Sequence, residues 1–514
     1  ERPPNQVRYP AAGTANAAVE LELVSLDGAF TTIDWSDGGR FEYLADVVWQ
    51  PGHHPLIVRQ TRDQRLVSIA ELPLGEVGGD GLPKADEVGE LYTITDDIWV
   101  ELQPGAPRWC SAGLLTIEDR DGARRLVLGG EPLSDTRLNV RSIVGVRHDS
   151  ADEPGAESDE AGASSDAAVV VSAWTEPTEI HLFELPLPGS GLAESQLTVA
   201  PGVHAGALGA ATLAITSSVP DRPGSQVTVA DLSPTEGGRA AAIIDRSAEP
   251  GFAAAPEFCA LGTDNLEAAL FLPTDHDGST PLPVLVDPYG GPHAQRVLKT
   301  HNPHLVSRWF AENSYAVLVT DGRGTPGRGP AWERAVWGDL AGPVLDDQLA
   351  ALDAVIDRYH FLDASRVAIR GWSFGGYLAA LAVLRRPDRF HAAIAGAPVT
   401  TWRLYDTHYT ERYLGHPSVF PEHYDRSDLW VENEDGPQLE RLERPLLLIH
   451  GLADDNVVSA HTLRFSTALL ATGSPHRVLP LSGVTHMTPQ EAVAENLLRL
   501  QLDFLDETIG RGEL

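Results

Sequence analysis

Two patterns of hydrophobic and polar residues divide the chain. From about residue 19 to 245, short apolar runs alternate with turn residues, as in "VELELVSL" (19–26) and "AAVVVSAW" (167–174), with almost no helical periodicity. We count about 13 or 14 such runs at fairly even spacing, which favours a propeller or a sandwich. At four strands per blade, this is only about three or four blades. The first half is therefore predicted to be part of a β-propeller.

After about residue 250 the pattern changes to apolar strands alternating with helical segments. This alternation predicts an α/β domain with a mostly parallel sheet. The expected strands lie in "PLPVLVDPYGG" (281–291), "SYAVLVTDGRG" (314–324), "SRVAIRGWS" (365–373), "HAAIAGAP" (391–398), "RPLLLIHG" (444–451) and "PHRVLPL" (475–481).

A length of 514 residues exceeds one ordinary domain. We place a propeller portion at 1–250 and the α/β domain at 251–514. The stretch "HDSADEPGAESDEAGASSDA" (148–167) interrupts the strand pattern with acidic and small residues. It lacks the apolar content needed to pack, so we interpret it as a solvated loop insertion rather than an interaction tail.

Charge and composition exclude several classes of function. A net charge of −35 disfavours binding to nucleic acid or anionic lipid. No run of 18 apolar residues occurs, so no membrane span is expected. Two cysteines are too few for a disulfide framework or a tetrahedral metal site, and we expect no metal and no cofactor. These features favour the cytoplasm, although the chain opens with Glu1 and an export segment could precede it.

The segment "RGWSFGGYLAA" (370–380) contains a G-x-S-x-G motif between an expected strand and an expected helix. Glycines permit the tight turn that would raise the Ser373 hydroxyl above the sheet edge. A serine needs a base and an orienting carboxylate to become a nucleophile. Asp454 and Asp455 follow one late strand and His486 follows the next, in the chain order of α/β-hydrolases. Spacing alone leaves the choice between the two aspartates open.

An oxyanion hole is the remaining requirement for acyl transfer. The backbone N–H of Phe374 is one expected donor. The segment "DPYGGP" (287–292) follows an early strand and offers the Tyr289 hydroxyl as a second donor, although Tyr289 by itself is equally compatible with packing. The aromatic run "WRLYDTHYTERY" (402–413), judged from spacing alone, is more typical of an amphipathic core helix than of a binding pocket.

The C-terminal half resembles the prolyl oligopeptidase family, in particular its dipeptidyl peptidase IV branch. The resemblance rests on "GWSFGGY" (371–377), "DGRGTPGRG" (321–329), "HGLADDNVV" (450–458) and "VTTWRLYDTHYTERYLG" (399–415), and continues weakly through "RYPAAGTANAAVEL" (8–21). It implies a propeller joined to an α/β-hydrolase domain. It also implies Ser373 as nucleophile, Asp454 as orienting acid, His486 as base, and Tyr289 with Phe374 as oxyanion donors.

The same resemblance implies a compact pocket for a proline or alanine side chain, with Asn456 helping to hold a substrate carbonyl. Closely spaced aromatic rings would make a shallow slot for a flat five-membered ring. The residues implied are Val399, Trp402, Tyr405, Tyr409, Asn456 and Val457.

Two departures from the family pattern affect the expected function. Phe374 stands where the family usually has tyrosine, which removes a hydroxyl but keeps the backbone amide. The paired glutamates that bind the substrate's amino terminus in this branch would precede Glu1, and "EE" occurs nowhere in the sequence. Either that part of the propeller is not in this chain, or the amino-terminal clamp is absent.

The sequence therefore predicts a serine peptidase that releases dipeptides from peptides with Pro or Ala at the second position, through an acyl-enzyme on Ser373. Its partners would be peptide substrates, and the resemblance implies a homodimer. An acylaminoacyl peptidase or another oligopeptidase of the same family is the alternative within enzymes. A carboxylesterase or lipase would share the triad but leaves the strand-rich half unexplained. From another class, the alternative is a non-catalytic propeller binding protein.

Overall fold

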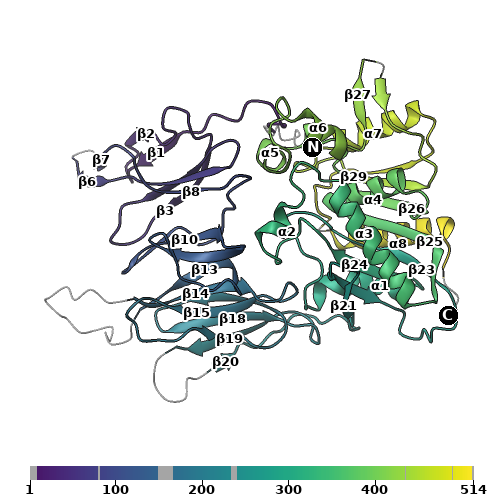
Figure 1. Cartoon of the computed structure of the whole chain (residues 1–514), viewed down its shortest axis with the longest axis horizontal. Coiled ribbons are helices and arrows are strands. Elements are labelled where there is room, and N and C mark those ends of the chain that lie inside the picture. Colours follow the sequence, from purple (N-terminus) through teal and green to yellow (C-terminus); the bar gives the residue numbers. More distant parts are fainter. Residues whose placement is uncertain are drawn as a thin grey trace.

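A computed structural model describes residues 9–78, 81–148, 166–232, 240–434, 436–488 and 490–511, which form a β lobe and an α/β lobe (Figure 1). Residues 149–165, most of the acidic insertion predicted at 148–167, lie outside the described residues. The last strand of the β lobe is β20 (Ala240–Ala242) and the first of the α/β lobe is β21 (Glu257–Leu261). The division into 1–250 and 251–514 remains a proposal.

The β lobe contains four antiparallel sheets of four strands each. Strands within a sheet are consecutive in the chain, except that the ribbon β6–β7 lies between β5 and β8. The sheets follow one another down the lobe in chain order (Figure 1). The strands are β3 (Tyr43–Val48), β4 (Leu56–Gln60), β5 (Leu66–Glu71) and β8 (Gly89–Thr95); β9 (Arg108–Cys110), β10 (Gly113–Arg120), β11 (Ala123–Leu128) and β12 (Glu131–Pro132); β13 (Asn139–His148), β14 (Asp166–Trp174), β15 (His181–Pro186) and β16 (Ser195–Gln196); β17 (Val203–Leu208), β18 (Thr212–Ser218), β19 (Gln226–Asp231) and β20, with ribbons β1 (Leu21–Val24)–β2 (Phe30–Ile33) and β6 (Leu74–Val77)–β7 (Pro83–Ala85).

Packing between successive sheets explains the apolar run of β14. Val169 and Val171 pack with Leu115 of the preceding sheet, whereas Val170 packs with Leu213 of the following sheet. A strand buried on both faces has a continuous apolar run rather than an alternating one. Short edge strands such as β12 and β16 carry no such pattern. The described β lobe therefore has 20 strands, more than the apolar runs indicated.

The α/β lobe is built on one eight-stranded sheet in the order β21-β22-β24-β23-β25-β26-β29-β30. The β21–β22 and β22–β24 pairs are antiparallel and the others are parallel, so the sheet is mostly parallel as predicted. The six strands expected from the sequence are present. These are β23 (Leu282–Val286), β24 (Ala316–Asp321), β25 (Leu362–Trp372), β26 (Ala392–Gly396), β29 (Leu446–Gly451) and β30 (Arg477–Leu481), joined at one edge by β21 and β22 (Leu266–Phe271).

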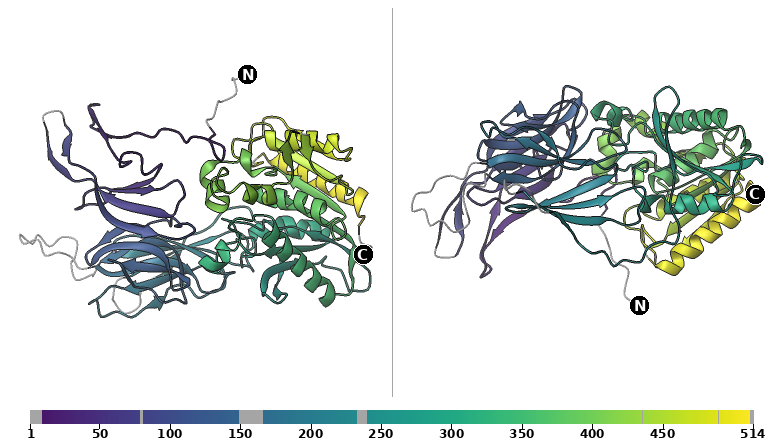
Figure 2. Two further views of the ribbon diagram at one scale, coloured as in Figure 1. Left: turned by 45° about the horizontal axis from the view of Figure 1, so that its top comes forward. Right: turned by 90° about the horizontal axis from the view of Figure 1, so that it is seen from below.

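Helices cover both faces of this sheet. Val367 and Ile369 of β25 pack into the core that includes α3 and α4, while Ala368 packs into the core that includes α1 and α8. Figure 2 shows α8, in yellow, along one side of the sheet. The helices are α1 (Leu305–Glu312), α2 (Pro330–Arg334), α3 (Gly342–Arg358), α4 (Phe374–Arg385), α5 (Thr407–Leu414), α6 (Pro421–Ser427), α7 (Ala460–Ala471) and α8 (Glu491–Thr508), with 3₁₀ turns η1 (Asn302–His304) and η2 (Trp402–Leu404) and a ribbon β27 (Val431–Asn433)–β28 (Gly436–Gln438).

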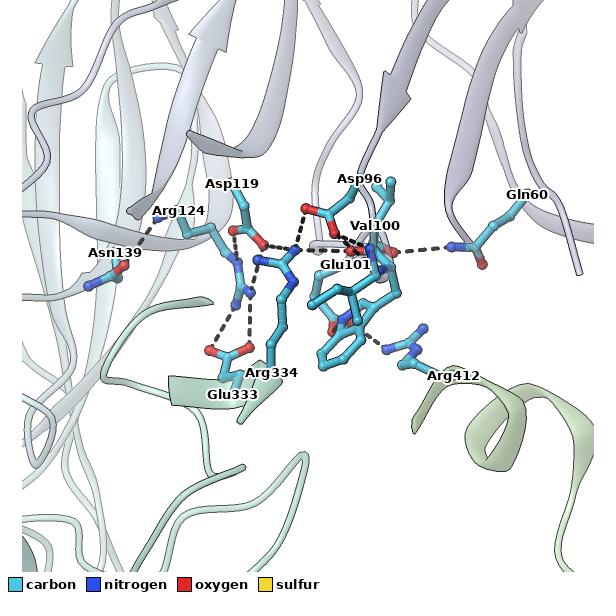
Figure 3. Close-up of polar contacts among 12 residues, drawn as sticks. Gln60, Asp96, Val100, Glu101, Asp119, Arg124, Asn139, Glu333, Arg334 and Arg412 are labelled. Carbon is cyan, nitrogen blue, oxygen red and sulfur yellow. Dashed lines mark hydrogen bonds and ion pairs between the residues drawn. The ribbon is translucent and has the colours of Figure 1, made fainter. Parts of the chain in front are cut away.

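A buried ionic network joins the two lobes, and α2 supplies its α/β side (Figure 3). Arg124 of β11 lies 2.9 Å from both Glu333 and Asp119. Arg334 lies 2.9 Å from both Asp119 and Asp96. Burial makes an unpaired charge costly, so each member depends on its partners across the interface.

Two more ion pairs link the β lobe to α5. Arg412 lies 2.8 Å from Glu101, and Arg62 donates two hydrogen bonds of 2.8 Å to Glu411. Neighbouring arginines hold the pKa of Glu101 below its usual value although burial opposes this. The helix that carries Tyr409 is therefore fixed to the β lobe by ionised side chains.

Replacing Arg124 tests this interface. Arg124→Ala leaves Glu333 buried without its cation and Asp119 with Arg334 alone, and we expect a loss of about 3–5 kcal/mol in the free energy of unfolding. Urea unfolding followed by tryptophan fluorescence measures it. Arg499→Ala, which removes one partner of an exposed pair with Glu495, is the control and should change the midpoint little. Equal effects of the two variants would contradict a structural role for the network.

Candidate active site

Ser373 occupies a turn between β25 and α4 that only glycines permit. Its backbone has φ 59° and ψ −117°, an unfavourable conformation for a non-glycine residue that is typical of functional sites. A Cβ atom on Gly371 would lie 2.2 Å from the Gly375 carbonyl oxygen, and one on Gly376 would lie 2.2 Å from the Gly396 carbonyl oxygen. The turn therefore presents a half-buried Ser373 at the carboxyl end of the sheet.

The structure brings His486 and Asp454 together. His486 Nδ1 lies 2.8 Å from Asp454 Oδ2, while Asp454 Oδ1 accepts hydrogen bonds from the backbone N–H groups of Asn456 at 3.0 Å and Val457 at 2.9 Å. Asp454 is buried and Asp455 is exposed. The spacing left these two aspartates as alternatives, and only Asp454 lies against the histidine.

Asp454 is held in its ionised form. Burial raises the pKa of the Asp454 carboxyl, but hydrogen bonds with His450 and His486 and with the Asn456 amide outweigh burial and hold the pKa well below its usual value. A carboxylate at Nδ1 orients the imidazole and leaves Nε2 free to accept a proton.

The loop that carries His486 is fastened next to Ser373. The indole N–H of Trp372 donates to the His486 carbonyl oxygen at 2.8 Å. Trp372 also packs on Gly396, where a Cβ atom would lie 2.0 Å from the indole ring. Trp372 therefore holds the His486 loop beside Ser373.

Tyr289 and Phe374 lie side by side, with ring centroids 5.8 Å apart. Gly290 and Gly291 allow this approach, since a Cβ atom on Gly291 would lie 2.3 Å from the Phe374 ring. Burial raises the pKa of Tyr289 to about 12, so its hydroxyl remains a hydrogen-bond donor at neutral pH. With the Phe374 N–H at the start of α4, two donors are available near Ser373.

The aromatic residues expected to form a pocket do cluster. The rings of Trp402 and Tyr409 are stacked with centroids 5.9 Å apart, and Tyr405 meets Tyr409 edge-on at 5.2 Å. The Tyr405 hydroxyl donates to Asn456 Oδ1 at 2.9 Å. Val399 and Val457 are buried in the same region.

The interpretation of residues 402–413 as one amphipathic helix is wrong. Trp402–Leu404 form the 3₁₀ turn η2, Tyr405 is extended, and α5 begins at Thr407. Asp406 causes the break, because its side chain accepts the Tyr409 N–H at 2.8 Å as an N-cap. The break turns Tyr405 and Tyr409 toward each other.

Comparisons with known proteins agree with this geometry. Residues 303–512 match the model of the prolyl oligopeptidase family, and residues 2–140 match that of the dipeptidyl peptidase IV (DPP IV) N-terminal region. Residues 303–512 therefore form a domain of the prolyl oligopeptidase family. The β lobe is accordingly part of a β-propeller and the α/β lobe is an α/β-hydrolase domain, which confirms the predicted fold class.

Individual relatives match part of their own length. Over 250 residues the chain is 36% identical to human dipeptidyl peptidase 8, covering 48% of this chain and 27% of that relative. It is 34% identical to human prolyl endopeptidase FAP over 203 residues, 39% of this chain and 26% of that relative. The crystal structure of Porphyromonas gingivalis dipeptidyl peptidase 4 has the same fold, with a TM-score of 0.78 at 23% identity over 98% of this chain and 68% of that chain. The match therefore spans about a quarter of the curated relatives' length.

Sequence reasoning missed a contribution from the first described residues. Ala12 N–H donates to the Tyr405 carbonyl oxygen and Thr407 N–H to that of Pro10. The Tyr9 hydroxyl donates to the Asn456 carbonyl oxygen at 2.7 Å, and the rings of Tyr9 and Tyr405 are 6.3 Å apart. The segment "RYPAAG" was noticed only through the family resemblance, and nothing local in it indicates contact with residues about 400 positions away.

The described part of the chain contains neither a metal-binding cluster nor a membrane-spanning helix. No group of three or more His, Cys, Asp or Glu there could hold a metal ion. None of the described helices is both long enough and apolar enough to cross a membrane. Cys110 is buried and Cys259 half-buried, and both are free thiols.

Neutralising Asp454 tests the arrangement around His486. Asp454→Asn should slow covalent labelling of Ser373 by a fluorophosphonate roughly 10⁴-fold, because an amide favours the wrong imidazole tautomer. Asp455→Asn is the matched control and should label at the original rate. Labelling rates are measured by gel fluorescence. Equal rates for the two variants would contradict the assignment of Asp454.

Proposed function

We propose that this protein is a serine peptidase that removes dipeptides from peptides with proline or alanine at the second position. The observation that carries the proposal is the turn at Ser373, fastened through Trp372 to a histidine that is paired with a buried carboxylate. Family membership supports the same class of chemistry.

In the proposed mechanism, the Ser373 hydroxyl attacks the scissile carbonyl carbon while His486 Nε2 takes its proton. The oxyanion accepts hydrogen bonds from the Phe374 N–H and the Tyr289 hydroxyl. His486 then gives the proton to the leaving amine, the C–N bond breaks, and an acyl-enzyme remains on Ser373. Water, deprotonated by His486, attacks the ester carbonyl carbon. The bond to Ser373 Oγ then breaks, His486 returns the proton to that oxygen, and the dipeptide acid is released. Asp454 stays ionised and stabilises the imidazolium throughout.

The residue before the cut would occupy the space bounded by Trp402, Tyr405 and Tyr409. These rings are held by mutual contacts and by the capped start of α5, so the slot is rigid. A rigid slot between aromatic rings suits a flat pyrrolidine ring or a methyl group and excludes longer side chains. Asn456, held by Tyr405, would donate to the substrate carbonyl through its amide nitrogen.

An endopeptidase or acylaminoacyl peptidase is the second candidate. The two candidates differ in the amino-terminal clamp, since carboxylates that hold the substrate ammonium set the dipeptide length, and in this branch those carboxylates would precede Glu1. A homodimer and a cytoplasmic location are further proposals that follow from the sequence and the family resemblance.

Hydrolysis of a Gly-Pro chromogenic amide, beside its N-acylated form, separates these candidates. We expect cleavage of the free-amine substrate with at least a tenfold preference over the blocked one. Ser373→Ala should abolish both reactions. Equal cleavage of both forms, or preference for the blocked form, would replace the dipeptidyl assignment with the second candidate. Full activity of Ser373→Ala would overturn the serine mechanism.

Tyr9 provides a test of how the pocket is held. Tyr9→Ala removes the ring that packs near Tyr405 and the hydroxyl that bonds to Asn456, so we expect KM for a short proline amide to rise about 3- to 10-fold, while kcat changes little. Tyr9→Phe keeps the ring and should show a smaller rise in KM. Steady-state kinetics measure both. A large fall in kcat with unchanged KM would mean that Tyr9 acts on the triad instead.

A further inference from the structure

A chamber of about 610 Å³ lies between the two lobes, beside the aromatic pocket. Tyr413 and His293 line it and also contact the pocket, since their rings lie 5.0 Å and 5.2 Å from that of Tyr409. The opposite wall belongs to the β lobe and includes Arg141 and Trp174. A peptide held in the pocket would have this chamber within reach.

Arg141 enters the chamber because β13 carries a bulge at this position. Val140 pairs with Ala173 and Ser142 with Ser172, so Arg141 is the extra residue that has no partner on β14. A bulge of this kind redirects one side chain out of the alternating pattern and is frequent next to active sites. The Arg141 guanidinium lies 5.6 Å from the centroid of the Trp174 ring.

The other charged groups of the chamber wall neutralise one another. Glu333 is paired with Arg124, and Glu101 is paired with Arg412. Burial lowers the pKa of His293, so this histidine is neutral at pH 7. Of the charged residues that line the chamber, Arg141 is therefore the one that has no ion-pair partner among the described residues.

Arg141 itself has no anionic partner among the residues that the structure describes. Its side chain is exposed to the chamber, and its one contact of note is the face of Trp174. Burial lowers the pKa of Arg141 without any opposing effect from a carboxylate. An arginine side chain stays protonated in a protein even when burial lowers its pKa. The Arg141 guanidinium therefore offers five hydrogen-bond donors to a ligand in the chamber.

We propose that Arg141 is a recognition site for a carboxylate of the peptide substrate, outside the residue that occupies the aromatic pocket. The inference deepens the proposed peptidase function and rests on it. A guanidinium that is oriented by an indole ring and free of other partners binds a carboxylate through two parallel hydrogen bonds. The carboxylate belongs either to an acidic side chain or to the C-terminus of a short peptide.

The net charge of −35 bears on which peptides such a site would select. The negative electrostatic field of the whole protein repels acidic peptides. A carboxylate on a peptide therefore strengthens binding only where a local cation outweighs that field. Arg141 supplies such a cation inside a chamber with low-dielectric walls, where a charge pair is stronger than at the open surface.

Kinetics with matched peptides test the proposal. The substrates are fluorogenic peptides that share one proline. Each of the other positions is occupied in turn by Glu or by Gln, and each peptide is made with a free C-terminal acid and with a C-terminal amide. For the native protein, we expect one carboxylate in this series to raise kcat/KM about tenfold over its neutral counterpart, since a hydrogen bond to a charged group contributes this much. The position of that carboxylate distinguishes a side chain from the C-terminus.

Substitutions then assign the effect to Arg141. Arg141→Gln should abolish the tenfold preference while the neutral peptides are still cleaved at the native rate, and Arg141→Lys should keep part of it. Arg137→Gln removes the same charge from the exposed pair with Asp135, and is the control for long-range electrostatics. Retention of the preference in Arg141→Gln, or its equal loss in Arg137→Gln, would overturn the proposal.

A binding measurement separates this proposal from the peptidase function. Calorimetry on Ser373→Ala protein compares the Glu and Gln peptides, with and without Arg141→Gln, and needs no turnover. A carboxylate preference in binding that depends on Arg141 supports the site even if the native protein cleaves none of the peptides, in which case the peptidase proposal alone fails. Equal affinities for the Glu and Gln peptides at every position would overturn the carboxylate site.

Discussion

The close approach of three backbone segments around Ser373 is the constraint on which the site depends. The turn after β25 lies against its own helix start at Gly375, against β26 at Gly396, and against the 288–291 loop, where a Cβ atom on Gly375 would lie 2.5 Å from the Pro288 carbonyl oxygen. Side chains at these positions would force the segments apart. Because side chains are absent at these glycines, a strained serine can lie at the junction of the sheet, the His486 loop and the Tyr289 loop.

The segments around that junction are held in place by hydrogen bonds and ion pairs as well as by apolar packing. Trp372 fixes the loop of His486, Asp406 caps the helix that carries Tyr409, and Arg62 with Arg412 fixes the same helix to the β lobe. Contacts from both domains therefore position the aromatic residues of the pocket. A change in how the lobes meet would move the Tyr405 and Tyr409 rings relative to Ser373, which is held by the α/β sheet.

The same interface creates the chamber and sets its charge. Arg124 is paired with Glu333 and Arg412 with Glu101. These pairs hold the interface together, and their charges are not available to a ligand. Arg141 differs because a β-bulge, and not an ion pair, determines where its side chain goes. One surface thus combines buried ion pairs that join the domains with an arginine, Arg141, that has no ion-pair partner among the described residues and lines the chamber.

Residue spacing along the chain was enough to predict the features that are set locally. These include the change from strand runs to α/β alternation near residue 250, the six parallel strands, and the Ser373 turn with its acid and histidine in hydrolase order, because periodicity and turn chemistry act over a few residues. Other features required the folded chain: Asp454 and not Asp455 meets His486, an N-cap at Asp406 interrupts the aromatic segment, and Tyr9 reaches Asn456. The folded chain also leaves Arg141 without an ion-pair partner among the described residues. Each of these outcomes depends on contacts or register between segments that the folded chain brings together, and residue spacing carries no information about such contacts.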